Sequence, residues 1–316
     1  MLTFVTRQTR KLAIVYVIAT LLFDIVLVSR APGQTPAKAE EKTITLGIVS
    51  EINQQEIADH FRDFVRYVAN KLSSASPIDG KIVVTSTPSQ LAGLLTQKKV
   101  DFYMDSPYAT YVINGVHGAG KLLLRRWKRG VSEYQALIFT KRESETKRLE
   151  DLRGKIIVFE DPGSTSGHFL PKFFLSRRGL KLSEKTRIET QISPGEVGYI
   201  FAYSQDKLVD LVLTKQVAAG AFSNDDYAAL DEKKKLDITV LAETDRLPRH
   251  LLSIRTDMGP ALASRLERIL LSMHEDPEGH LVLQKTSETT KFDALPGGEA
   301  AMRRRLLETF YSPDKN

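Results

Sequence analysis

One short segment of the chain, which reads Gly-Ser-Thr-Ser-Gly-His, concentrates hydrogen-bond donors that suit a small anion. Ser164, Thr165 and Ser166 supply three hydroxyl groups, and the ring of His168 adds a fourth donor that can carry charge. The pattern around Gly167 is typical of a helix start, where first-turn N–H groups lack helical partners and face the positive end of the helix dipole. The segment therefore predicts a binding site for an oxyanion.

An ordinary helix cap explains part of this pattern, because a Ser or Thr before a helix commonly accepts a hydrogen bond from its first turn. Three hydroxyls and a histidine exceed what a cap requires, so both interpretations stay open for Ser164 and Thr165. Two sharper motifs do not fit. A phosphate-binding P-loop ends in Gly-Lys-Ser/Thr, and this segment has no lysine. A nucleophile elbow needs Ser midway between its glycines, where this chain has Thr165.

The segment lies between a predicted strand and a predicted helix, and this order places such a turn at the edge of a sheet. The apolar run Ile156–Phe159 predicts a buried parallel strand, and Glu-Asp-Pro-Gly ends it. The helix that follows is expected to run to about Arg178, with Gly179 as the residue just after its end.

A βαβαβ unit is predicted before this segment. Its expected strands are residues 44–49, 81–85 and 100–104. Thr87, followed by a proline, predicts the start of the second helix. Ligands of parallel sheets bind at the carboxyl ends of the strands, so the loops that follow these strands should line one crevice. Those loops are residues 50–53, 86–89 and 105–108.

A second α/β unit contains the donor segment. Its expected strands are residues 155–159, 187–192, 209–213, 217–222 and 238–242. Besides the helix after Ser166, helices are expected at residues 195–204 and 225–230, the latter capped by Asn224. A strand at residues 251–254 and helices at residues 260–275 and 298–311 complete the chain. The sequence therefore predicts the α/β class.

Composition excludes several kinds of protein. With 316 residues, of which 42% are hydrophobic and 27% charged, the chain is an ordinary globular protein of one large domain or two lobes. Four of its six net positive charges lie in residues 1–39, so the remainder does not indicate a nucleic-acid partner. The absence of cysteine excludes disulfides, thiolate metal sites and a cysteine nucleophile.

The N-terminal segment predicts export. Three basic residues precede Leu12–Phe23, an uncharged apolar run that Asp24 interrupts. This arrangement is typical of a signal that keeps its N-terminus in the cytoplasm, either cleaved as a signal peptide or retained as a membrane anchor. Residues 30–42 are expected to form a polar linker.

The motif Asp-Pro-Gly-Ser-Thr-Ser-Gly-His, with Pro171 after it, closely resembles the signature of substrate-binding proteins of phosphate/phosphite/phosphonate ABC transporters. The resemblance extends more weakly over about residues 43–256. It implies a bilobed, periplasmic binding protein type II-like fold, with two βαβ lobes joined by a two-crossing hinge that closes on the ligand. The boundaries that follow are residues 43–140 and 242–316 for lobe 1, residues 141–241 for lobe 2, and residues 1–39 for the export segment and linker.

The resemblance also implies which residues contact the ligand. The signature hydroxyls and His168 would donate to the oxygens of the anion, Tyr134 matches an aromatic residue before the first crossing, and Glu196 matches an acidic residue of lobe 2. Asn224 and Asp225 match a polar loop after a strand, although a purely structural role fits each of these four positions equally well. The full set of expected ligand-binding residues is Ser164, Thr165, Ser166, Gly167, His168, Tyr134, Glu196, Asn224, Asp225, Ser106 and Asp105.

Asp105 and Ser106 depart from the small, Gly-containing turn usual in the family. A carboxylate repels a dianion strongly in a closed cleft, so Asp105 suits a monoanion, a protonated oxyanion or a ligand with an amine. Phosphonate, phosphate, phosphite and a different small anion therefore all remain open.

The implied function is that of a non-enzymatic, exported, monomeric binding protein that delivers its ligand to an ABC permease, without cofactor, metal or nucleic acid. A membrane-anchored sensing domain for a signalling system is the alternative. A phosphate-ester enzyme is less favoured, because the six histidines show no metal-ligand spacing with carboxylates.

Overall fold

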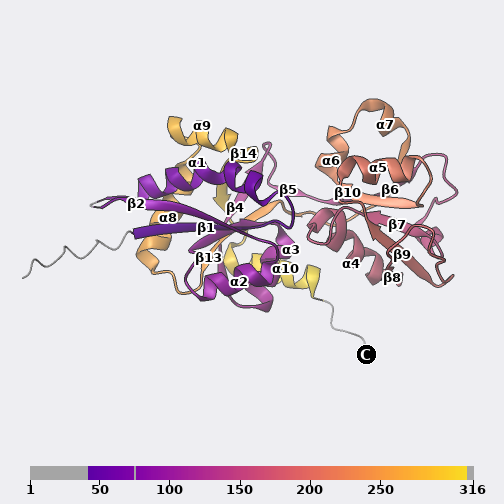
Figure 1. Ribbon diagram of the computed structural model, residues 1–316, viewed down its shortest axis with the longest axis horizontal. Coiled ribbons are helices and arrows are strands. Elements are labelled where there is room, and N and C mark those ends of the chain that lie inside the picture. Colours follow the sequence, from indigo (N-terminus) through magenta and orange to yellow (C-terminus); the bar gives the residue numbers. More distant parts are fainter. Residues whose placement is uncertain (1–41, 75, 312–316) are drawn as a thin grey trace, which may run out of the picture. The chain divides into compact units, whose positions relative to one another are not determined.

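The computed structural model describes residues 42–74 and 76–311, so the predicted N-terminal export segment lies outside the described residues. The described residues form two mixed six-stranded sheets, each with its own helices (Figure 1). This bilobed α/β architecture is the predicted one. Within the same residues, no helix combines the length and the apolar character needed to cross a membrane.

The first sheet has the strand order β2-β1-β3-β13-β4-β14. Its strands are β1 (Lys42–Val49), β2 (Ile78–Thr85), β3 (Phe102–Asp105), β4 (Gly120–Lys128), β13 (His250–Arg255) and β14 (Thr289–Ala294). β1 runs parallel to β2 and β3, as the βαβαβ pattern predicts, whereas β13 is antiparallel to β3 and β4. The start of β13 therefore lies at the same edge of the sheet as the carboxyl ends of β1, β3 and β4.

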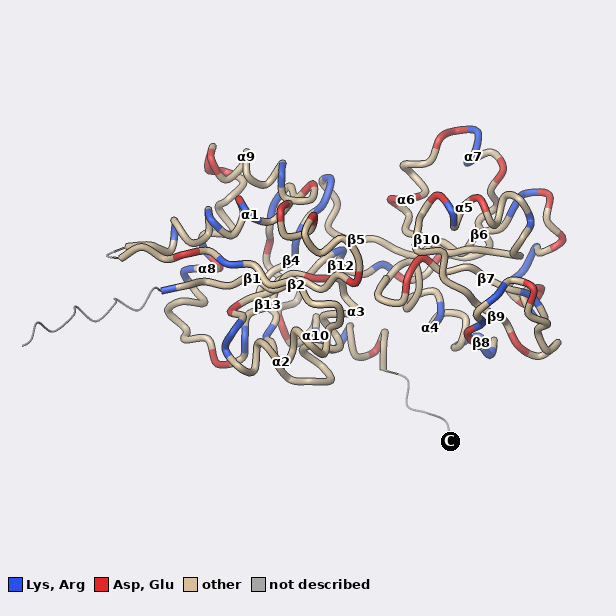
Figure 2. The backbone as a smooth tube through the Cα atoms, in the orientation of Figure 1, with Lys and Arg blue, Asp and Glu red and all other residues tan. Residues whose placement is uncertain are grey.

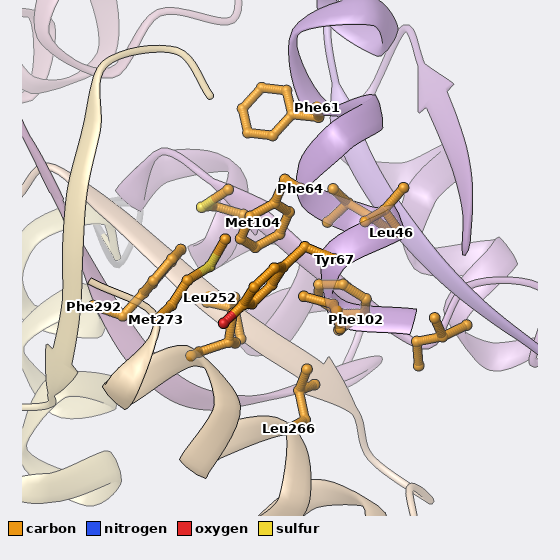
Figure 3. Close-up of a cluster of buried hydrophobic side chains, with 14 of the residues drawn as sticks. Leu46, Phe61, Phe64, Tyr67, Phe102, Met104, Leu252, Leu266, Met273 and Phe292 are labelled. Carbon is orange, nitrogen blue, oxygen red and sulfur yellow. The ribbon is translucent and has the colours of Figure 1, made fainter. Parts of the chain in front are cut away.

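Helices cover both faces of this sheet. They are α1 (Gln54–Leu72), α2 (Pro88–Thr96), α3 (Pro107–Thr110), η1 (Tyr111–Val116), α8 (Pro260–Ser272) and α9 (Pro277–Lys285). The core on one face packs α1, α8 and α9 against the strands, with the rings of Phe64 and Phe292 5.8 Å apart (Figure 3). α2 packs on the other face, and its first turn is capped by Thr87, which accepts a hydrogen bond from the Gln90 N–H as the sequence predicts.

The second sheet has the strand order β11-β6-β10-β7-β9-β8. Its strands are β6 (Ala136–Lys141), β7 (Ile156–Phe159), β8 (Lys181–Glu184), β9 (Glu196–Phe201), β10 (Ala219–Ser223) and β11 (Ile238–Glu243). β7 to β10 are mutually parallel, and the predicted strand Ile156–Phe159 is confirmed as β7. The helices of this lobe are η2 (Leu149–Leu152), η3 (Thr165–Phe169), α4 (Leu170–Arg177), α5 (Gln205–Leu213), α6 (Asn224–Ala229) and α7 (Glu232–Leu236).

Three predicted elements of the second lobe are wrong. The expected strand at residues 187–192 is irregular, and the expected helix at residues 195–204 is largely strand β9. The expected strand at residues 209–213 belongs to helix α5, because Ser204 caps that helix and its apolar residues recur at helical spacing. A short apolar run is compatible with the periodicity of a helix and with that of a strand. Here residues 196–201 form strand β9 because they pair with β7 on one side and β8 on the other.

The chain passes between the sheets through a short antiparallel pair, β5 (Glu133–Tyr134) and β12 (Leu247–Pro248). β6 and β11 pair with each other and belong to the second sheet. The crossings therefore lie before Ala136 and after Glu243, rather than near Thr140 and Leu241.

Aromatic side chains from both lobes meet around the C-terminal helix α10 (Gly298–Phe310). The ring of Phe310 lies 5.4 Å from that of Tyr108 and 6.0 Å from that of Phe173, and Tyr108 stacks on Phe169. Away from this cluster, Lys and Arg are interspersed with Asp and Glu along both lobes (Figure 2).

Candidate functional site

A cleft of about 730 Å³ opens where strands of both lobes end. The first lobe contributes residues 50–52 and 86–89 together with Asp105, Ser106 and Tyr108, which confirms that the three predicted loops line one crevice. The second lobe contributes residues 160–166 after β7, Tyr203 after β9, Ser223 at the end of β10 and Asp226 in α6. The donor segment thus lies in the cleft because β7 delivers it to the carboxyl edge of the second sheet.

Ser164 is the N-cap of the continuous helix formed by η3 and α4. Its side-chain oxygen accepts a hydrogen bond from the Gly167 N–H at 2.9 Å, and its hydroxyl donates to the Glu160 carboxylate at 2.8 Å. The capping interpretation therefore holds for Ser164, and these two bonds fix the shape of the turn. Gly179, with φ of 76°, follows the end of α4 as predicted.

Thr165 and Ser166 are buried at the wall of the cleft, and both have first-turn N–H groups without an intrahelical acceptor. The Thr165 hydroxyl oxygen accepts a hydrogen bond from the Tyr108 N–H at 3.1 Å, which links the two lobes. Tyr134 also lines the cleft. Burial raises the pKa of its hydroxyl, against the opposing effects of Arg249 and of the hydroxyls of Thr165 and Ser166. Three hydroxyls thus converge at one place in the cleft.

His168 lies behind the turn and does not line the cleft. Its side chain is only 4% exposed and packs among aromatic rings, those of Phe159 and Phe201 included. Nδ1 lies 3.1 Å from the Pro162 carbonyl oxygen, which can only accept, so the ring proton is on Nδ1. Burial lowers the pKa of His168 to about 4. His168, expected to donate to the anion, is therefore a neutral ring that supports the turn, because the helix periodicity turns this residue toward the core.

The buried neutral state of His168 predicts a loss of stability in acid. The unfolded chain binds a proton near the ordinary histidine pKa of 6.5, whereas the folded chain resists protonation down to about pH 4. The free energy of unfolding should therefore fall by about 3 kcal/mol through this group between pH 7 and pH 4. Urea unfolding of the protein and of His168→Gln across this range would measure the difference.

The matched control is His60→Gln, because His60 is exposed on α1. Its pH profile should coincide with that of the unaltered protein. A His168→Gln profile that keeps the full acid loss would show that His168 is not the group responsible.

Carboxyl groups line the cleft on both sides, Asp105 in the first lobe and Glu160 beside the donor turn in the second lobe. Asp105, 9% exposed, accepts hydrogen bonds from the N–H groups of Val49 at 2.9 Å and Ser106 at 2.7 Å, and burial raises its pKa to about 6. Burial also raises the pKa of Glu160, to about 7. Both carboxyls can hold a proton in mild acid and then donate to an anion, whereas in the ionised state they accept from a ligand that brings its own donor. No group of acidic or histidine side chains in the described ranges is arranged to hold a metal ion.

Five of the expected ligand residues lie outside the cleft lining, namely Gly167 and His168 of the turn together with Glu196, Asn224 and Asp225. Glu196 begins β9, at the end of the strand remote from the cleft, and pairs with Lys181 at 2.6 Å. The family resemblance implied a ligand contact for Glu196, but the residue begins a strand at the edge of the sheet away from the cleft. The Asn224 side chain accepts a hydrogen bond from the Gln135 N–H at 2.9 Å, and Asp225 forms a largely buried ion pair with Arg249. Asn224 and Asp225 therefore brace the hinge rather than facing the ligand.

Three basic residues line the cleft and were not predicted from the sequence. They are Lys128, Arg249 and His250, at the end of β4 and the start of β13. The order of the strands contains a signal for these residues. A strand that returns to the first sheet after the second lobe can run antiparallel, and its first residues then lie at the ligand edge.

Comparisons with known proteins identify the family and the fold. A family model described as "ABC transporter, phosphonate, periplasmic substrate-binding protein" matches residues 46–295. A phosphate-import protein of Mycolicibacterium smegmatis is 24% identical over 271 residues, which are 83% of this chain and 81% of that protein. A Xanthomonas citri protein solved bound to ATP superposes with a TM-score of 0.76 at 26% identity, over 85% of this chain and 96% of that one. A Prochlorococcus marinus protein in complex with methylphosphonate shares the fold, with a TM-score of 0.60 at 15% identity, over 85% and 97%.

Proposed function

We propose that this chain, which belongs to the family of periplasmic substrate-binding proteins of phosphonate ABC transporters, is exported and binds a phosphorus oxyanion in the cleft between its lobes. The observation that carries the proposal is the position of Thr165 and Ser166 on the cleft wall, at the start of a helix. Hydroxyls and free first-turn N–H groups at a helix start suit the oxygens of a phosphate, phosphite or phosphonate group.

Binding would also bring the lobes together. Thr165 already accepts a hydrogen bond from the Tyr108 N–H of the first lobe, and the rings of Tyr108 and Phe169 stack. A ligand held by donors of the second lobe and facing Asp105 of the first lobe would add to these contacts. Closure of this kind lets a membrane permease distinguish loaded from empty protein.

A membrane-anchored sensing role remains the second candidate, with the same cleft and the same ligand chemistry. The likeness to the Xanthomonas citri protein solved bound to ATP supports phosphate chemistry at the cleft in either role. In the sensing role, the N-terminal segment of this chain would be retained as a membrane anchor. The proposal of a phosphate-ester enzyme has no comparable support.

Titration calorimetry of the purified protein tests the proposal with phosphate, phosphite, methylphosphonate, 2-aminoethylphosphonate, ATP and sulfate. At least one phosphorus compound should bind, and Ser166→Ala should weaken it about tenfold, the effect of one hydrogen bond to a charged group. The matched control is Ser176→Ala, which removes an exposed hydroxyl from the far end of the same helix. Equal affinities of the Ser166→Ala variant and the control would place the oxyanion elsewhere.

A further inference from the structure

Four basic side chains gather at one end of the cleft. Arg126 and His250 are directly paired across β4 and β13, so their side chains leave the same face of the sheet, and Lys128 follows two residues after Arg126. Arg249 joins them from the hinge. The positive charges of Arg126, Arg249 and Lys128 act together with burial to lower the pKa of His250. These groups are therefore near enough to repel one another.

The described residues neutralise this cluster only in part. Arg249 pairs with Asp225, and Lys128 lies 3.5 Å from the exposed carboxylate of Glu288. Arg126 is 2% exposed, and its hydrogen bonds go to neutral oxygens, including the Thr289 hydroxyl at 2.7 Å. The carboxyl of Asp105 is a further acidic group that acts on Arg126.

Two buried nitrogen atoms of the cluster have no hydrogen-bond partner among the described residues, Nε of Arg249 and Nδ1 of His250. Arg249 is 7% exposed, and both residues line the cleft. A buried guanidinium N–H without an acceptor is costly, and an anion in the cleft would supply the acceptor.

Tyr134 is close to both this cluster and the donor turn. The guanidinium of Arg249 lies over the Tyr134 ring, 5.2 Å from its centre, while the Tyr134 hydroxyl is next to the hydroxyls of Thr165 and Ser166. The two groups of donors thus lie on either side of the Tyr134 hydroxyl, and the 730 Å³ cleft has room for a ligand longer than a single tetrahedral anion.

We infer that Lys128, Arg249 and His250 form a second anion subsite, so that the ligand of this protein carries two or more linked anionic groups, as a phosphate chain does. The inference rests on the proposed function, since one phosphoryl group occupies the turn at Thr165 and Ser166. The next phosphoryl group lies against the basic cluster. The cluster then selects for the length and total charge of the ligand, and the turn selects for the tetrahedral anion.

The experiment compares inorganic phosphate, pyrophosphate and tripolyphosphate by titration calorimetry, with the full-length protein, Lys128→Gln and the matched control Lys121→Gln. Lys121 is an exposed lysine near the opposite end of the same strand β4, so its variant has the same change of net charge. Pyrophosphate should bind at least about tenfold more tightly than phosphate, and Lys128→Gln should remove most of that advantage. Lys121→Gln should retain it, and thermal melts would confirm that both variants fold.

The outcomes separate the two proposals. Equal binding of phosphate and pyrophosphate, or an advantage of pyrophosphate that Lys128→Gln leaves intact, overturns the second subsite while the oxyanion site stands. Failure of all three compounds, together with failure of the phosphonates and phosphite tested above, overturns both. An advantage that Lys121→Gln reduces as much as Lys128→Gln would indicate general charge attraction and would also overturn the subsite.

Discussion

Replacing Gly167 with alanine is expected to weaken oxyanion binding about 100-fold while the protein stays folded, since about two charge-assisted hydrogen bonds would be lost. A Cβ atom at Gly167 would lie 2.6 Å from both Cβ and Oε2 of Glu160 and 2.9 Å from Oγ of Ser164. Such contacts cannot persist, so the turn must shift and the donors of Thr165 and Ser166 with it. Titration calorimetry with whichever phosphorus compound binds the unaltered protein measures the effect.

Gly163→Ala is the matched control, because Gly163 belongs to the same loop. The nearest atom to its added Cβ would be Oδ1 of Asp161 at 3.3 Å, the end of a side chain that can move. We expect its affinity to stay within about threefold of the original, less than the effect of one hydrogen bond. Normal binding by Gly167→Ala would mean that the turn does not hold the anion.

Breaking the ion pair of Asp225 and Arg249 is expected to cause the largest loss of stability. Their side chains are only 12% and 9% exposed, and the pair joins the start of α6 to the hinge strand β12 and its neighbour β13. Asp225→Asn would leave the Arg249 cation buried without its counter-charge. Removing one partner of a buried pair costs about 3 to 5 kcal/mol, which urea unfolding would detect as a lower midpoint.

The double variant Asp225→Leu/Arg249→Met should recover most of this loss, because neither buried charge is then left unpaired. Glu189→Gln serves as the control, since Glu189 and Arg187 form an ion pair at 3.3 Å with both side chains largely exposed. Its cost should stay below about 1 kcal/mol. An Asp225→Asn variant as stable as Glu189→Gln would show that water reaches the pair and screens it.

The local order of the chain determined much of the fold. The apolar run Ile156–Phe159, the turn residues after it and the hydroxyls before an amphipathic stretch are signals between near neighbours, and they placed β7 and the start of its helix correctly. The βαβαβ pattern also located the first-lobe loops at the cleft, because parallel strands with helical crossovers all end at one edge. The turn that contains Thr165 and Ser166 was also predicted from residues that are neighbours in the sequence.

Tertiary structure alone decided the rest. Whether His168 faces the ligand or the core depends on the aromatic rings packed around it, and whether residues 196–201 form a strand depends on β7 and β8 on either side. The basic cluster brings together Lys128 and His250, far apart in sequence, through the pairing of β4 with β13. Burial, strand pairing and the interactions between charges depend on residues that are far apart in the sequence. Local sequence patterns therefore do not specify them.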